Sequence, residues 1–229
     1  MKNPARGGGR WIEVAPERLV AWADSFAERH PGVSVTMTAE GAIFLAADGA
    51  TAQCHAPFPP LPQAVQAAQV ARAGEAAGLI ASHATAARTV GVLLVRLGGY
   101  AAGVFTGSPP RLAASKVGSR LVHGRSAAGG TSQHRFARRR EKQAAEALSA
   151  AADNAAKVFT PYRAALDAVV LGGDRRSVAA LREDVRLARY FALASGRFLA
   201  VPDPRLNVLR DSPRLFLAIR IRLTGPGQD

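Results

Sequence analysis

The sequence predicts an α/β protein in which a small α+β N-terminal domain precedes a larger domain with a glycine-rich loop and a long basic helix. Three observations lead to this fold class. Apolar and polar residues alternate over residues 33–47, as they do in a β-hairpin. A proline-rich segment follows at 57–62, and beyond residue 88 strand-like apolar runs alternate with helical segments. Such alternation of strands with helices is typical of an α/β sheet.

The first domain is expected over residues 1–64. Segment 16–29 has apolar residues at helical spacing and a proline suited to the first turn, so we expect an amphipathic helix there. Residues 33–38 and 42–47 are the two strands of the hairpin, separated by a Glu-Gly pair. The proline-rich segment 57–62 is predicted to be a stiff linker that ends this domain.

The second domain is expected over residues 88–229, after an alanine-rich helical linker at 65–87. It opens with a run of valine and leucine at 89–96, which indicates a buried strand. Another strand is expected at 100–106, directly after the Gly98-Gly99 turn.

A loop of mostly small residues occupies 124–132 and includes Gly124, Gly129 and Gly130. Residues 133–158 contain neither glycine nor proline, which predicts a long helix, and Pro161 ends it. The remaining predicted elements are short strands at 112–116 and 119–123, a strand at 166–171, a helix at 174–184, and late strands at 197–201 and 215–222.

The net charge is concentrated around this loop and helix. The chain has 30 Lys and Arg residues against 17 Asp and Glu, a formal charge of +13. Residues 1–64 carry five basic and six acidic side chains, whereas residues 111–142 carry nine basic and one acidic, a net charge of +8. A solvated basic face would also have this composition, but its position around a glycine-rich loop favours a nucleic acid partner.

Metal and cofactor chemistry is not expected. The single cysteine, Cys54, cannot form an internal disulfide or a cysteine zinc cluster. The five histidines lack the spacing of metal ligands; they are His30, His55, His83, His123 and His134. No signature of a bound cofactor is present either, so we expect none.

A membrane location is not expected either. The best apolar run, residues 90–105, is interrupted by Arg96 and the Gly98-Gly99 pair, and it is shorter than the roughly 18–20 apolar residues of a membrane span. The N-terminus lacks the apolar run of a secretory signal. We therefore expect a cytoplasmic protein.

The loop does not have the pattern of a nucleotide site. No Gly-Lys-Ser/Thr follows its glycines, and their spacing differs from a dinucleotide fingerprint. The arginines that follow are more informative, because cations in the first turns of a helix oppose its dipole. Four arginines lie there, namely Arg135, Arg138, Arg139 and Arg140. Successive residues of a helix point about 100° apart, so such a helix suits an RNA cavity that surrounds it.

The run from Gly118 to Arg140 resembles the catalytic loop of the Vms-like release factors, most of all their actinobacterial branch. These are relatives of the middle domain of eukaryotic and archaeal class-one release factors. The resemblance covers roughly residues 88–222 and implies a release-factor-like domain with a mixed sheet. In that family a Gly-x-x-Gln element replaces the Gly-Gly-Gln of termination factors, and here it falls on Gly130, Thr131, Ser132 and Gln133.

The resemblance implies a peptidyl-tRNA hydrolase that acts on the ribosome in rescue or quality control. Gln133 would position water for ester hydrolysis, and Gly129 and Gly130 would allow close approach to RNA. The expected nucleic-acid-binding residues are Arg120, Arg125, Arg135, Arg138, Arg139, Arg140 and Lys142. The expected partners are the large ribosomal subunit with its rRNA and peptidyl-tRNA, and we expect the protein to be a monomer.

Two other functions are compatible with the same residues. The chain would be a non-catalytic ribosome- or RNA-binding module if the loop bound RNA without hydrolysis. It would be a stand-alone esterase if it cleaved free peptidyl-tRNA. A Ser132–His134 nucleophile and base pair is disfavoured, because the mobile loop expected here does not readily supply a third orienting group and an oxyanion hole.

Overall fold

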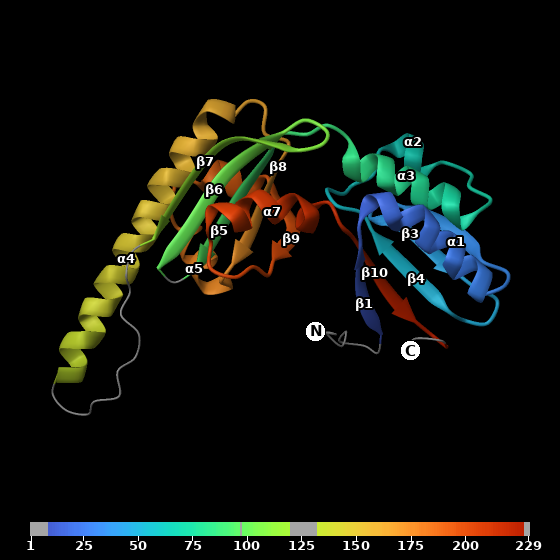
Figure 1. Cartoon of the computed structure of the whole chain (residues 1–229), viewed down its shortest axis with the longest axis horizontal. Helices are drawn as coiled ribbons and strands as arrows, with labels where there is room; N and C mark the ends of the chain where they lie inside the picture. The colour runs from blue at the N-terminus through green and yellow to red at the C-terminus, as the bar shows by residue number, and fades with distance from the viewer. Residues whose placement is uncertain (1–8, 97, 120–131, 227–229) are drawn as a thin grey trace. The chain divides into compact units, whose positions relative to one another are not determined.

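The computed structural model describes residues 9–96, 98–119 and 132–226, and for residues 132–140 it describes the backbone but not the side chains. The chain forms two compact units (Figure 1). The first contains Met1–Ala86 together with Arg214–Asp229, and the second contains Ala87–Pro213.

The first unit is built on a five-stranded antiparallel sheet. Its strands are β1 (Arg10–Val14), β2 (Ser34–Thr38), β3 (Gly41–Leu45), β4 (Thr51–His55) and β10 (Ile219–Thr224). They lie in the order β1-β10-β4-β3-β2, so the last strand of the chain is inserted between β1 and β4.

Helices cover one face of this sheet. They are η1 (Pro16–Arg18), α1 (Leu19–Arg29), α2 (Gln63–Gln66) and α3 (Ala73–Thr85). Phe44 of β3 and Ile219 and Ile221 of β10 point to this face and are buried with Phe26 of α1 and Ile80 of α3. Each such side chain contributes about 1.5–3 kcal/mol by its burial.

The predicted hairpin and the first helix are confirmed by β2, β3 and α1. The limits of the unit differ from the expected ones in two places. The segment 65–87 is not only a linker, because α3 buries Ala73, Ala77 and Ile80 in this core. The C-terminal segment returns to the first unit through β10, because its alternating isoleucines complete the buried face of this sheet.

The second unit is built on a five-stranded mixed sheet, as predicted. Its strands are β5 (Val90–Arg96), β6 (Gly99–Thr106), β7 (Arg111–Ser119), β8 (Ala168–Gly173) and β9 (Ala194–Leu199). The order is β7-β6-β5-β8-β9, in which β5, β6 and β7 are antiparallel and β5, β8 and β9 are parallel.

Helices cover both faces of this sheet, which explains why β5 is apolar along nearly its whole length. The helical elements are α4 (Ser132–Phe159), η2 (Thr160–Tyr162), α5 (Arg175–Leu181), α6 (Ala188–Ala192) and α7 (Leu206–Phe216). Leu93 and Val95 are buried against Phe159 of α4 on one face. On the other face, a Cβ added at Gly103 would lie 2.9 Å from Cδ2 of Leu209 in α7.

Two predictions for the second unit are wrong. The segment 112–116 is not a separate short strand, because it belongs to β7, which extends from Arg111 to Ser119 with a register shift against Val104 and Phe105. Most of the other predicted short strand, 119–123, lies outside the described residues. Residues 215–222 are not one strand, because Phe216 ends α7 and β10 begins only at Ile219. The helix α7, which contains Pro213, was not predicted from the sequence.

Candidate nucleic-acid interface

The α4 helix is anchored at its C-terminal half only. It has 28 residues and is therefore about 42 Å long. Its buried residues, Ala151, Ala152, Ala155, Val158 and Phe159, all lie in its last nine positions, whereas none of the described side chains from residue 141 to 150 is buried. The first turns of α4 extend beyond the strands of the sheet (Figure 1).

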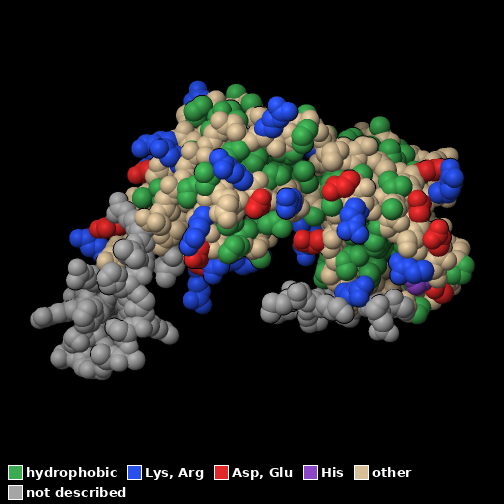
Figure 2. Space-filling view, in the orientation of Figure 1, with side chains coloured by type: hydrophobic (Ala, Val, Ile, Leu, Met, Phe, Trp, Pro, Cys, Tyr) green, Lys and Arg blue, Asp and Glu red, His purple; other side chains and the backbone are tan. Residues whose placement is uncertain are grey.

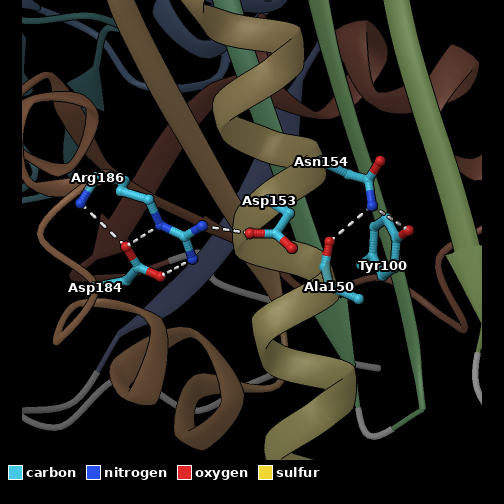
Figure 3. Close-up of polar contacts among 6 residues, drawn as sticks. All are labelled: Tyr100, Ala150, Asp153, Asn154, Asp184 and Arg186. Atoms are coloured by element: carbon cyan, nitrogen blue, oxygen red, sulfur yellow. Dashed lines mark hydrogen bonds and ion pairs between the residues drawn. The ribbon is translucent and has the colours of Figure 1, made fainter.

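A hydrogen bond joins α4 to the sheet at Asn154. Its side-chain amide donates to the hydroxyl oxygen of Tyr100 in β6 at 2.7 Å and to the Ala150 carbonyl at 2.8 Å (Figure 3). Tyr100 is paired with Gly118 of β7, and a Cβ at Gly118 would overlap the tyrosine ring. The glycine therefore gives the ring room to reach α4.

An ion-pair network holds a second side of α4. Arg186 donates to Asp153 of α4, and its Nε donates to Asp184 Oδ1 at 2.8 Å (Figure 3). The hydrogen bonds from Arg186 hold the pKa of Asp184 below its usual range, and the two carboxylates raise the pKa of Arg186. All three side chains are partly exposed, so the network orients α4 more than it stabilises the fold.

Aromatic packing completes the anchor at the end of α4. The rings of Phe159 and Tyr190 meet edge to face with their centroids 5.2 Å apart. Oγ1 of Thr160 and the hydroxyl oxygen of Tyr190 are 3.2 Å apart, so one donates a hydrogen bond to the other. The last turns of α4 are therefore held by both apolar and polar contacts.

Most predicted site residues lie at the other end of α4. Gln133 is its second residue, and Arg135, Arg138, Arg139 and Arg140 follow within its first nine positions. Lys142 is also on α4 and is exposed. The helix backbone thus brings these six residues together on its projecting end. Gly129, Gly130, Arg120 and Arg125 lie outside the described residues.

The net positive charge belongs almost wholly to the second unit. From Ala87 to Pro213 the chain has 21 basic and nine acidic residues, a net charge of +12 out of the total of +13. Lys and Arg side chains are spread over the visible face of this unit (Figure 2). A surplus of this size favours a polyanionic partner.

Residues 88–222 match the family model described as the Actinobacteria/chloroflexi VLRF1 release factor. The chain belongs to this family. The family is described as a release factor, and the match includes the loop and the whole of α4. The family resemblance and the fold class predicted from the sequence are both confirmed.

The comparisons with solved structures and with curated proteins are less specific for this VLRF1 family member. The crystal structure of the archaeal translation termination factor aRF1 is similar to it with a TM-score of 0.40 and 10% sequence identity, covering 90% of this chain and 66% of that one. The chain thus spans slightly less than two thirds of that protein's length. No curated protein matches it.

The described part of the chain contains neither a membrane-spanning helix nor a cluster of metal ligands. Across those residues, no helix has the length and apolar character to cross a bilayer. In the same part of the chain, three or more His, Cys, Asp or Glu side chains do not gather as metal ligands would.

Sequence reasoning missed the residues that anchor α4 in this VLRF1 family member. Tyr100 and Asn154 are 54 positions apart, and Asp153 and Arg186 are 33 apart. Neither pair forms a local pattern, so only the strand order reveals them. The pairing of Gly118 with Tyr100, which accompanies one of these contacts, is likewise apparent only from the strand register.

Proposed function

We propose that this protein is a ribosome-associated peptidyl-tRNA hydrolase that acts in ribosome rescue or quality control. The proposal depends on one observation. Gln133 occupies the first turn of the projecting end of α4, within the segment matched by a release factor family. An anchored helix of about 42 Å can carry a residue at its tip into a cavity that the rest of the unit does not enter.

The reaction would be attack of water on the ester that joins the peptide to tRNA. The side chain of Gln133 does not titrate near neutral pH, so it would orient the water through its amide and not act as a general base. The first backbone N–H groups of a helix have no intrahelical carbonyl partner. That of Gln133 would therefore be free to donate to the developing oxyanion.

The neighbouring residues would serve RNA binding. Gly129 and Gly130 would permit the backbone conformations and close approach that a loop against RNA requires. Arg120, Arg125, Arg135, Arg138, Arg139, Arg140 and Lys142 would contact phosphates of rRNA or tRNA. An external anion would also offset the unfavourable interaction of these cations with the N-terminal dipole of α4.

The proposed partners are the large ribosomal subunit and its peptidyl-tRNA, bound by a monomer in the cytoplasm. Most of the rate enhancement would come from positioning of water and ester inside the ribosomal centre, where tRNA and rRNA supply the remaining groups. No cofactor enters this scheme.

Peptide release from purified 50S or 70S complexes that carry peptidyl-tRNA tests the proposal. The wild type should release peptide, and Gln133→Ala should not, although it should bind the ribosome nearly as well. Release from free peptidyl-tRNA without ribosomes would instead indicate a stand-alone esterase. Equal release by both proteins would contradict the proposed role of Gln133.

The basic charge of the second unit also fits a non-catalytic ribosome- or RNA-binding module. Such a module would bind 50S particles in a salt-dependent manner and release no peptide at any concentration. The same assay therefore separates the two functions.

A further inference from the structure

A second group of arginines lies on the segment from α5 to α6, which is separate in sequence from the tip of α4. Its members are Arg175, Arg176, Arg182, Arg186 and Arg189, and all five are exposed. The acidic residues of the same segment are Glu183 and Asp184, and Asp184 is bound by Arg186. The segment therefore carries a surplus of positive charge on its surface.

Two of these arginines are held against aromatic rings. The guanidinium carbon of Arg175 lies 4.3 Å from the ring centroid of Phe198 in β9. That of Arg182 lies 4.8 Å from the ring centroid of Phe191 in α6. We call these four residues the Arg–Phe surface. Arg175 is the first residue of α5, and Arg182 is its C-cap residue with helical backbone angles. The seven positions between them place both on the same side of the helix, about 10 Å apart along its axis.

This arrangement orients both guanidinium groups so that they can bind an anion. A guanidinium stacked on a ring keeps its N–H edges free, and its planar fork matches the oxygens of a phosphate. The ring also restricts the side chain before binding, which lowers the entropy lost when a ligand is bound. Lysine in the same place would provide the charge without the stacking or the fork.

We propose that the Arg–Phe surface binds the phosphate backbone of RNA as a contact separate from the α4 tip. The identity of that RNA as rRNA rests on the proposed function; the binding itself does not. RNA is favoured over an acidic protein because the whole unit carries a charge of +12 and two stacked arginines suit successive phosphates better than scattered carboxylates.

The surface is coupled to α4 by contacts within the second unit. Arg186, between Arg182 and α6, donates to Asp153 of α4, and the pKa of Asp184 is lowered by the same arginine. Asp153 lies 20 positions after Gln133, which corresponds to about 30 Å along the helix. RNA bound at the Arg–Phe surface would therefore set the direction in which α4 points.

Binding of the full-length protein to purified 50S particles tests the inference. The measurement uses the Gln133→Ala background, so a failure of the proposed hydrolysis leaves the test intact, whereas absence of 50S binding by the parent protein would count against the proposed function itself. The test variant is Arg175→Gln/Arg182→Gln. The matched control is Arg18→Gln/Arg29→Gln, which removes the same charge from exposed positions of the first unit. Thermal unfolding verifies that both variants are folded.

The Kd of the test variant for 50S particles should be about tenfold higher than that of the parent protein. The magnitude of the slope of log K against log salt should be smaller by about 1.5, as expected for two lost phosphate contacts. The control should change the Kd less than about twofold, and Arg175→Lys/Arg182→Lys should lie between the two. Equal affinities of the test variant and the control would overturn the inference. The inference would also be overturned if the test variant kept its affinity for 50S particles but lost its affinity for polyglutamate, a probe for an acidic protein partner.

Discussion

The side-chain amide of Asn154 in α4 donates a 2.7 Å hydrogen bond to the hydroxyl oxygen of Tyr100 in β6. This contact lies in the half of α4 that packs on the sheet, between the buried residues Ala152 and Ala155. The orientation of the projecting half, and with it the place of Gln133, depends on this end of the helix.

Tyr100→Phe should lower the free energy of unfolding by about 1 kcal/mol, because it removes one neutral hydrogen bond while the ring stays in place. Asn154→Ala should have a similar or slightly larger effect, since Asn154 also donates to Ala150. Urea denaturation of the two single variants and the double variant measures the coupling between them. Strictly additive losses would show that the two side chains do not interact.

Gly118→Ala should destabilise the protein by about 1–3 kcal/mol, because the new methyl group would overlap the ring of Tyr100. Gly196→Ala is the matched control, since nothing lies within 4 Å of a Cβ at that strand position. The control should be neutral or slightly stabilising, as alanine loses less backbone entropy in a strand. Equal midpoints of unfolding for the two variants would contradict the close approach of Tyr100 to β7.

The effect of Asp184→Asn on the free energy of unfolding should depend on pH. Arg186 lowers the pKa of Asp184 in the folded state, so its contribution to stability is present above the unfolded pKa of about 3.9 and is lost as the pH falls through the folded pKa. The difference in unfolding free energy between wild type and variant should therefore be constant above about pH 5 and shrink below about pH 4. Arg186→Gln should abolish this dependence, and a difference that grows in acid would have the wrong sign.

Replacement of Arg138, Arg139 and Arg140 together by glutamine should weaken binding to 50S particles and flatten its salt dependence. Each lost contact to single-stranded RNA phosphate reduces the slope of log K against log salt by about 0.7, so the slope should fall by about 2. Arg18, Arg29 and Arg72 of the first unit are exposed and serve as a control with the same loss of charge. An unchanged slope in the test variant would mean that these three arginines do not contact phosphate.

Local patterns predicted much of the fold. The alternation around the Glu-Gly pair yielded the β2–β3 hairpin, and the absence of Gly and Pro yielded α4. The insertion of β10 between β1 and β4 was not predictable in this way, because it joins residues about 200 positions apart. Strand β4 was missed because three of its five residues are polar, and β1 was missed because its strand partner, β10, is about 200 positions away.

The candidate site was predicted in a similar way. The positions of Gln133 and the arginines on one helix followed from the sequence, and the structure places all of them in the first turns of α4. The contacts that hold the other end of that helix did not follow from it. Asp153 and Arg186 meet because α4 and the segment between α5 and α6 pack into the same core. Long-range packing, rather than local propensity, determines where the tip projects.

The rate of peptide release at saturating protein tests the central claim most directly, because it separates chemistry from binding. Gln133→Ala should release peptide from 50S complexes at least about 100-fold more slowly than the wild type, as expected when a positioned polar group is lost. Gln143→Ala, ten residues further along the same helix, should release it at the wild-type rate. Release by Gln133→Ala as fast as by Gln143→Ala would contradict the account.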